Sequence, residues 1–263
     1  MNKQILILGS SGLIGSRMYK FLKDKNIPVK GISRSKCETT DLIHDFSTEG
    51  FSKKIQELIS DSSLVINLLS IAHIEDDTSN IIDTNIKLIK NALAYDYADK
   101  TNIYFSSEDA ILDIKNNANN NWPFWIKYGV SKGECEKLCL KNSSCIVLRL
   151  PPFLDKNTKD REKRAFRIPF LNVKILFCPE VEFIYTDSEN LFSQLFFDRK
   201  TNGKYLKISP KKTRQSKLVQ DIDGFSIKLP RLILKIACEF LSLTIYRSYR
   251  ELFKPYFYRK FNL

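Results

Sequence analysis

The chain has 263 residues, of which 43% are hydrophobic and 27% charged, with nine glycines and nine prolines. This composition excludes a disordered, collagen-like or low-complexity protein and allows one large domain with a small appendage. The formal net charge of +12 is unevenly distributed, because residues 1–150 hold 19 Lys and Arg against 18 Asp and Glu, whereas residues 151–263 hold 23 against 12. The basic second half indicates an anionic partner: a nucleoside diphosphate, a nucleic acid or an anionic membrane.

The cysteines and apolar segments indicate a cytoplasmic protein. The six cysteines include no Cys-x-x-Cys pair, so we expect reduced, mostly buried thiols and no metal site. Glycines break the apolar run at the N-terminus, which favours a first strand over a signal peptide. The chain has no run of about 20 uninterrupted apolar residues, so we expect a soluble protein that is at most peripheral to a membrane.

Short apolar runs alternate with helical spacing throughout residues 1–150, a pattern typical of parallel crossover units. The expected strands are Gln4–Leu8, Val29–Ile32, Leu64–Leu69, Asn102–Phe105 and Cys145–Leu150. The expected helices are Leu13–Lys25, Phe51–Ser60, Ile81–Tyr97 and Tyr128–Lys141. The pattern predicts an α/β fold: a Rossmann-like, doubly wound parallel sheet that binds its ligand beyond the carboxyl ends of the strands.

After Pro151 and Pro152 the alternation stops, and we expect residues 151–245 to form a small substrate-binding region interleaved with the last elements of the sheet. The expected elements there are a charged loop at 155–167, the strands Phe183–Tyr185 and Lys204–Ile208, the helix Glu189–Asp198, and an amphipathic helical stretch over 229–241.

Residues 246–263 form a separate tail, with seven aromatic and five basic residues against one acidic residue. Docking onto the chain's own domain or a dimer partner would account for this composition, as would peripheral contact with an anionic membrane. No nucleic-acid-binding module accompanies the tail, so we expect no nucleic acid partner.

A glycine-rich turn follows the first expected strand. Gly9 permits a tight turn, Gly12 lets the backbone approach a pyrophosphate, and Gly15 lets helix and strand pack closely. The pyrophosphate would then lie at the positive end of the helix. We therefore expect this turn to bind a nicotinamide dinucleotide through Gly9, Ser11, Gly12, Leu13, Ile14 and Gly15.

The residues after the second strand bear on the choice of cofactor. An acidic residue there would bind the ribose 2′-hydroxyl of NAD(H), but the chain has Ser33-Arg34-Ser35-Lys36. Arg34 and Lys36 either pair with a 2′-phosphate, the mark of NADP(H), or are two solvated charges. We expect NADP(H), with NAD(H) as the alternative, and Asp45 as the partner of the adenine amino group.

Tyr128 and Lys132 are four residues apart on an expected helix, so they share one face. A tyrosine has an ordinary pKa near 10, and a neighbouring ammonium group favours the phenolate. The pair predicts a general acid/base, with Lys132 lowering the pKa of Tyr128 and binding the nicotinamide ribose. Ser106 and Ser107, at the end of the preceding strand, supply a hydroxyl group.

Six segments follow one another along the chain in this order: GSSGLIG, VINLLSIAH, DTNIKLIKNAL, IYFSSEDAIL, YGVSKGECEKL and LRLPPF. With these segments in this order, the chain resembles the extended short-chain dehydrogenase/reductase superfamily, specifically its NAD-dependent epimerase/dehydratase (nucleotide-sugar) branch. The resemblance covers Lys3 to about Leu150 and resumes more weakly at 183–208. It implies that Ser107 binds the reacting substrate oxygen, that Tyr128 exchanges a proton with it and that Lys132 is the electrostatic partner of Tyr128. It also implies that Leu69, Ser70 and Asn85 line the cofactor channel.

The resemblance implies an NADP-preferring oxidoreductase that reduces a 4-keto sugar on a nucleoside diphosphate, in surface-polysaccharide biosynthesis, and a homodimer formed through the helices containing Asn85 and Tyr128. The alternatives are a 4-epimerase or dehydratase with tightly bound NAD, and a non-catalytic NAD(P)-sensing protein. Two features depart from the family pattern: Ile111-Leu112 replaces the usual Tyr-Gly, and the substrate region is short. Glu108 and Asp109 fall where sugar dehydratases carry an acid/base pair, but we expect them to be structural or solvated.

Overall fold

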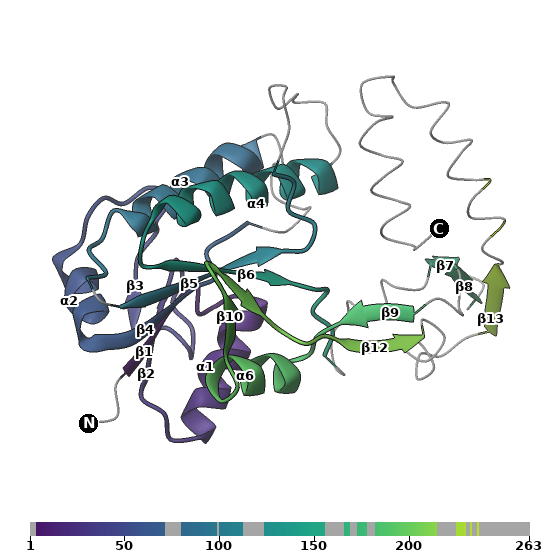
Figure 1. Ribbon diagram of the computed structural model, residues 1–263, viewed down its shortest axis with the longest axis horizontal. Helices are drawn as coiled ribbons and strands as arrows, with labels where there is room; N and C mark the ends of the chain where they lie inside the picture. Colours follow the sequence, from purple (N-terminus) through teal and green to yellow (C-terminus); the bar gives the residue numbers. More distant parts are fainter. Residues whose placement is uncertain are drawn as a thin grey trace. The chain divides into compact units, whose positions relative to one another are not determined.

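The computed structural model describes residues 4–71, 80–98, 100–112, 124–155, 166–168, 173–177, 182–214 and 225–229, together with Leu232 and Ile236 (Figure 1). The chain divides into two compact units. The first contains Met1–Pro151 and Ser188–Ser209, and the second contains Pro152–Asp187 and Pro210–Leu263.

An eight-stranded sheet forms the centre of the first unit, with the strand order β10-β11-β6-β5-β4-β1-β2-β3. Every neighbouring pair is parallel except β10 and β11. The strands are β1 (Gln4–Leu8), β2 (Val29–Ser33), β3 (Leu42–Ile43), β4 (Ser62–Asn67), β5 (Thr101–Ser107), β6 (Cys145–Leu150), β10 (Lys200–Asn202) and β11 (Tyr205–Lys207). The strand order reverses between β1 and β4, which confirms the expected doubly wound sheet.

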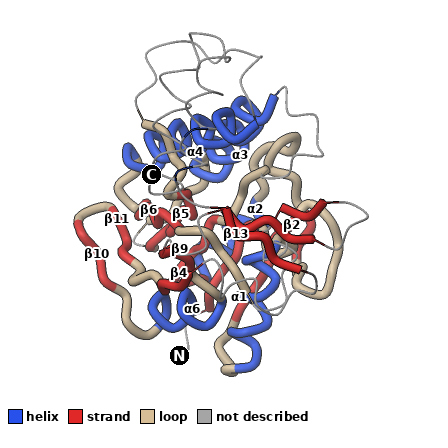
Figure 2. The backbone as a smooth tube through the Cα atoms, turned by 90° about the vertical axis from the view of Figure 1, so that its right-hand side faces the viewer, coloured by secondary structure: helices blue, strands red, loops and turns tan. Residues whose placement is uncertain are grey.

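Helices cover both faces of this sheet. Figures 1 and 2 show α3 (Ile81–Leu93) and α4 (Phe124–Lys141) side by side over one face, and α1 (Leu13–Asp24) and α6 (Ser188–Phe196) over the other. The helix α2 (Lys53–Asp61) packs against β1 and β4. Because the sheet is covered on both sides, its central strands are continuous apolar runs rather than alternating ones.

Two hydrophobic clusters hold the α3–α4 layer on the sheet. Leu6 and Leu8 of β1 pack in one cluster with Ile55 of α2 and Leu88 of α3. The second cluster lies further along the sheet and contains Ile89, Tyr104, Cys135, Cys139, Cys145 and Val147. The three cysteines of this cluster are free thiols, and all are buried.

The position of α4 is also fixed by a buried ion pair. Glu136 of α4 is fully buried and accepts three hydrogen bonds from Arg149 of β6, at 2.8, 3.0 and 3.1 Å. A two-pronged pairing of this kind constrains orientation as well as distance, so it sets the rotation of α4 relative to β6. The helix thereby presents the Tyr128–Lys132 face toward β5.

The two largest differences between the observed and the expected helix boundaries are in α4 and α3. The helix α4 begins at Phe124 rather than Tyr128, so Tyr128 lies inside the helix; Pro123 directly precedes this start, and proline favours a first helical turn. The helix α3 ends at Leu93 rather than Tyr97. Tyr97 turns back instead, and its buried hydroxyl donates to the Ala92 carbonyl oxygen at 2.7 Å.

The second unit contains two small sheets. The strand β9 (Glu182–Tyr185) pairs antiparallel with β12 (Lys211–Arg214), and β8 (Val173–Phe177) lies between β7 (Phe166–Ile168) and β13 (Phe225–Leu229). The expected loop at 155–167 was therefore wrong at its end, where Phe166 and Arg167 belong to β7. The basic residues of this stretch would either meet a sugar diphosphate or form a solvated loop, and those at 156–164 lie outside the described residues.

The helical stretch expected over 229–241 was also wrong at its start, because Leu229 ends the strand β13. Leu232 and Ile236 are helical, with 66% and 61% of their surface exposed. Within the described part of the chain, no helix is long and apolar enough to cross a membrane, and no group of His, Cys, Asp and Glu could hold a metal ion. The tail 246–263 lies outside the described residues.

Candidate functional site

The turn between β1 and α1 requires glycine at two positions. Gly9 has a φ of +87°, a conformation that L side chains rarely adopt. Its N–H and that of Ser10 both donate to the Ile32 carbonyl oxygen of β2, at 2.8 and 3.1 Å. A Cβ on Gly15 would overlap the carbonyl oxygen of Gly9, so only glycine lets α1 approach the turn.

The same turn leaves the start of α1 open. The N-cap residue Gly12 makes no side-chain hydrogen bond to the helix, and the first turn carries no acidic residue. Ser11, Gly12 and Leu13 are exposed, and Ile14 is half-buried. The first N–H groups of a helix lack intrahelical partners and lie at its positive end. These residues therefore fit the pyrophosphate of a dinucleotide, as expected from the sequence.

A hydroxyl network shapes the loop after β2. The Ser33 hydroxyl lies 2.6 Å from the Ser35 carbonyl oxygen and 2.7 Å from the Thr40 hydroxyl. Ser33 is at the position where an acidic residue would bind the ribose 2′-hydroxyl of NAD(H), but its hydroxyl group makes its hydrogen bonds to residues of the same loop. Arg34 and Lys36 are exposed on that loop.

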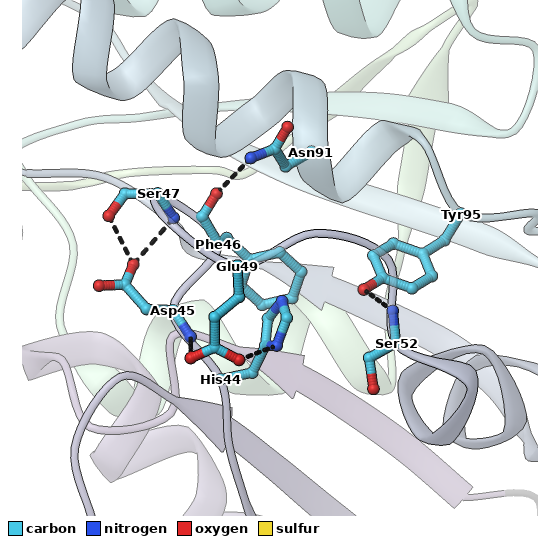
Figure 3. A network of polar contacts seen from close by, with 8 residues as sticks. All are labelled: His44, Asp45, Phe46, Ser47, Glu49, Ser52, Asn91 and Tyr95. Atoms are coloured by element: carbon cyan, nitrogen blue, oxygen red, sulfur yellow. Dashed lines mark hydrogen bonds and ion pairs between the residues drawn. The ribbon is translucent and has the colours of Figure 1, made fainter.

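Asp45 follows β3, and its carboxylate is hydrogen-bonded to Ser47 (Figure 3). Its carboxylate accepts hydrogen bonds from the Ser47 N–H at 2.8 Å and the Ser47 hydroxyl at 2.6 Å. Burial opposes its charge, but these hydrogen bonds outweigh burial and lower the pKa of Asp45, and the positive charge of Arg34 acts in the same direction. Arg34 and Asp45 therefore lie within electrostatic reach of each other.

The segment around Asp45 is fixed by contacts within the segment, through Glu49, and by a hydrogen bond to α3. Figure 3 shows that the Glu49 carboxylate contacts two neighbours. One oxygen lies 2.8 Å from Nδ1 of His44, and the other accepts a hydrogen bond from the Asp45 N–H at 3.1 Å. Asn91 of α3 donates to the Phe46 carbonyl oxygen at 2.6 Å. The segment that would contact adenine is thus rigidly attached to the helical layer.

Ser107, Tyr128 and Lys132 come together at the carboxyl end of β5. The side chain of Ser107, the last residue of β5, hydrogen-bonds to that of Tyr128 on α4. The Lys132 Nζ donates to the Phe105 carbonyl oxygen at 3.0 Å and lies 5.8 Å from the centroid of the Tyr128 ring. Three residues expected from motifs in two separate segments therefore form one cluster.

Burial dominates the electrostatics of this cluster. It raises the pKa of Tyr128 to about 12; the charge of Asp109 acts in the same direction, and the Ser107 hydrogen bond acts against both. The direction is opposite to the one expected from Lys132 alone. Burial also lowers the pKa of Lys132 to about 8. Tyr128 is accordingly a neutral phenol at pH 7 in the absence of ligand.

Asn85 links the segment expected to line a cofactor channel to α4, the helix that carries Tyr128 and Lys132. It is buried, its Oδ1 accepts from the Ile71 N–H at 2.7 Å, and its Nδ2 donates to the Ser131 hydroxyl at 3.0 Å. Ser131 in turn donates to the Tyr128 carbonyl oxygen at 2.8 Å. Leu69 and Ser70 directly precede Ile71 at the carboxyl end of β4, so Asn85 fixes this segment against α4.

Sequence reasoning missed two contributors to the site. Ser131 lies inside the Tyr-x-x-x-Lys spacing, and its position between the two motif residues could have identified it. Asp109, expected to be structural or solvated, acts on Tyr128 through its charge. No pattern in the sequence indicates that influence, because it depends on how the turn after β5 packs against α4.

The arrangement can polarise and protonate a carbonyl oxygen. A serine hydroxyl and a neutral phenol converge at the carboxyl edge of a parallel sheet, and a buried lysine stands beside them. If both hydroxyl groups donated to one carbonyl oxygen, they would stabilise the negative charge that develops there as the carbonyl carbon is reduced.

Residues 5–153 match the NAD dependent epimerase/dehydratase family, which confirms the resemblance expected from the sequence. No curated protein matches the chain. Among solved structures the chain is similar to UDP-glucuronic acid 4-epimerase from Bacillus cereus in complex with NAD, with 16% identity and a TM-score of 0.57 over 86% of this chain and 87% of that one. It is also similar to an NAD-dependent NDP-hexosamine 5,6-dehydratase of tunicamycin biosynthesis, with 12% identity and a TM-score of 0.59 over 86% of this chain and 84% of that one. A third similar structure is a monomeric L-threonine 3-dehydrogenase from a metagenome, with 16% identity and a TM-score of 0.57 over 89% of this chain and 87% of that one. At these identities the likeness shows the fold.

Proposed function

Because the chain belongs to the NAD dependent epimerase/dehydratase family, we propose that it is an NADP-preferring oxidoreductase that reduces a 4-keto sugar carried on a nucleoside diphosphate. The observation that carries this proposal is the cluster in which Ser107 hydrogen-bonds to Tyr128 with Lys132 beside them. The similarity to structures of a UDP-sugar epimerase and an NDP-hexosamine dehydratase supports the choice of a nucleotide sugar.

In the proposed reaction a nicotinamide cofactor, when bound, would provide the hydride that the carbonyl carbon accepts. Ser107 and Tyr128 donate hydrogen bonds to the carbonyl oxygen, and the Tyr128 phenol gives up its proton as that oxygen gains negative charge. Lys132 then faces a phenolate instead of a phenol, so its ammonium group stabilises the charge that Tyr128 acquires. The turn Gly9–Gly15 holds the pyrophosphate, and Leu69, Ser70 and Asn85 border the nicotinamide end.

The short substrate region and the exposed Arg34 support net reduction over the alternatives. Reduction of a carbonyl requires a phenol that gives a proton, whereas the first step of an epimerase or dehydratase oxidises an alcohol and requires a base. Tyr128 is a phenol at neutral pH even at the ordinary tyrosine pKa near 10, so it can serve as the proton donor of a reduction. A 4-epimerase or dehydratase with tightly bound NAD would use the same three residues, and a sensing protein would need only the cofactor-binding ones.

The loop after β2 supports NADP(H) over NAD(H). Arg34 and Lys36 are exposed there, and Ser33 is engaged within the loop. Both acidic residues of this loop are already paired: Glu38 with Lys20 of α1 at 3.1 Å, and Asp41 with Lys30 of β2 at 2.9 Å. Arg34 and Lys36 can therefore pair with a 2′-phosphate, and Ser33, the last residue of β2, offers no carboxylate for a ribose 2′-hydroxyl.

We also propose a cellular setting for this activity. A homodimer through α3 and α4 would suit a family member, and the basic aromatic tail 246–263 would suit peripheral contact with an anionic membrane. Both features fit an enzyme of surface-polysaccharide biosynthesis.

Mass spectrometry of ligands that remain bound on purification tests the proposal. We expect NADP(H), and any retained sugar to be a nucleoside diphosphate sugar. Retained NAD would favour the epimerase or dehydratase alternative. A protein that retains no dinucleotide and binds neither added NADPH nor added NADH would refute the cofactor assignment.

A further inference from the structure

Two glycines one turn apart give α4 a stretch of bare backbone. A Cβ on Gly129 would lie 2.6 Å from the Asp109 carbonyl oxygen and 3.1 Å from side-chain carbons of Ile111. A Cβ on Gly133 would overlap the carbonyl group of Ile111. Real Cβ atoms essentially never lie within 3.0 Å of an atom from another part of the chain, so the approaches to the Asp109 and Ile111 carbonyl groups leave no room for a side chain. The absence of side chains at Gly129 and Gly133 therefore lets the turn after β5 pack directly on the helix backbone. We term these two glycines the α4 notch.

The turn is tied to the notch and to the end of β5. The Ile111 N–H donates to the Gly129 carbonyl oxygen at 2.9 Å, which anchors the far end of the turn on α4. At the near end, the Ala110 N–H donates to the Ser107 carbonyl oxygen at 3.0 Å. Residues 107–111 are therefore held at both ends, between β5 and α4.

The same turn controls the direction of the Ser107 hydroxyl. The Asp109 N–H donates to the Ser107 Oγ at 3.1 Å, so this oxygen acts as an acceptor toward the turn. The hydroxyl proton is then available to Tyr128, and the Ser107 hydrogen bond lowers the pKa of Tyr128, as expected when Ser107 donates to the phenolate oxygen. The turn also carries the carboxylate of Asp109, whose charge acts on Tyr128.

We propose that Gly129 and Gly133 are positioning residues of the catalytic site: by admitting residues 109–111 against α4, they fix the Ser107 hydroxyl and the Asp109 carboxylate relative to the Tyr128 phenol. The inference rests on the proposed role of Tyr128 as proton donor. It also explains the departure at Ile111, because the isoleucine side chain is seated against Gly129.

The experiment observes Tyr128 directly and requires no substrate. In protein labelled with [¹³Cζ]-tyrosine, the NMR signal lost in Tyr128→Phe identifies the phenol, and its chemical shift reports the hydrogen bond and nearby charge. The test variant is Gly133→Ala. The matched control is Gly50→Ala, because a Cβ at Gly50 would meet nothing within 4 Å. The affinity for NADPH serves as a check that the cofactor domain is intact.

We expect Gly133→Ala to shift the Tyr128 signal in the direction that Ser107→Ala shifts it, with an NADPH Kd within about threefold of the wild type. The control variant Gly50→Ala should leave the Tyr128 signal and the NADPH Kd unchanged. An unshifted Tyr128 signal in folded, NADPH-binding Gly133→Ala would overturn the proposal. If the Tyr128 signal shifts as expected but no sugar nucleotide is reduced, the positioning role stands and the proposed function fails.

Should Gly133→Ala fail to fold, Ile111→Ala decides the question, because it removes the side chain seated on Gly129 and adds no atom. We expect a smaller shift of the Tyr128 signal in the same direction. A Tyr128 signal identical to the wild type in Ile111→Ala would contradict the proposal.

Discussion

The phenol of Tyr128 is subject to two opposing influences besides burial: the negative charge of Asp109 and the hydrogen bond of Ser107. A negative charge disfavours the phenolate, so removing it lowers the pKa of Tyr128. In a reductase the phenol is the acid, and activity is lost as the pH rises through its pKa. We therefore expect Asp109→Asn to move the alkaline limb of the pH profile of kcat/KM to lower pH.

The control for this prediction is Asp198→Asn, which removes an exposed carboxylate paired only weakly with Lys200, at 3.5 Å. It should leave the profile in place. A profile of Asp109→Asn that overlays the wild type would show that the carboxylate has no influence on the proton donor.

Lys132 is expected to reduce the stability of the free protein. Its pKa falls from 10.5 to about 8 because it is buried, so the unfolded state binds the proton more tightly than the folded state. The stability is therefore lowered as the pH falls from 10.5 through 8, and the loss is fully present at pH 7. We expect Lys132→Met to raise the free energy of unfolding at pH 7 by on the order of 1–3 kcal/mol while abolishing catalysis.

Urea unfolding of the cofactor-free protein at pH 7 and at pH 10.5 measures this effect. The advantage of Lys132→Met over the wild type should shrink at the higher pH. A variant that is less stable than the wild type at pH 7 would contradict the account, because it would mean that the buried ammonium group stabilises the fold.

At the scale of elements, the turn between β1 and α1 separates two roles of glycine. A Cβ on Gly15 would overlap the Gly9 carbonyl oxygen, whereas one on Gly12 would lie 3.4 Å from it, an ordinary contact. We expect Gly15→Ala to lower the free energy of unfolding by on the order of 1–3 kcal/mol. Gly12→Ala should keep the stability within about 1 kcal/mol and weaken NADPH binding at least tenfold, because a methyl group would occupy the place of the pyrophosphate.

Thermal unfolding and NADPH titration of the two variants distinguish these roles. Equal affinity of Gly12→Ala and the wild type for NADPH would place the pyrophosphate elsewhere. Unchanged stability of Gly15→Ala would contradict the close packing of α1 on the turn.

The elements also show where sequence reasoning succeeded and where it failed. Buried parallel strands are continuous apolar runs, so β1 and β6 were predicted with their observed bounds. The two-residue strand β3 is too short to give a pattern. In the second unit the expected strand Phe183–Tyr185 corresponds to β9, whereas β7, β8, β12 and β13 were not predicted. The motif spacing predicted Tyr128 and Lys132 as a pair. Contacts between distant segments, such as Gly133 with Ile111, have no local signal and required the structure.

At the scale of the whole molecule, the charge distribution separates two functions. Residues 1–150 are almost neutral, as suits a domain that binds an anionic cofactor through backbone N–H groups and a few cations. Residues 151–263 carry nearly the whole excess of positive charge. In our proposal this half faces the sugar diphosphate and, through the tail 246–263, an anionic membrane.

The membrane contact predicts binding that depends on charge and on the tail. The full chain should sediment with vesicles containing anionic lipid and remain in solution with neutral vesicles, and truncation at Tyr246 should abolish binding without changing NADPH affinity. High salt should weaken the binding. If the full chain fails to sediment with anionic vesicles at low salt, the tail has another role.

The central claim is that Tyr128 donates the proton when NADPH reduces a nucleotide-linked 4-keto sugar. It is tested most directly by following NADPH oxidation with a nucleoside diphosphate 4-keto sugar in the wild type and in Tyr128→Phe, which keeps the ring and removes only the hydroxyl. The account predicts turnover by the wild type and a rate at least about 100-fold lower in Tyr128→Phe, with NADPH affinity within about twofold. Equal rates in the two proteins would contradict it.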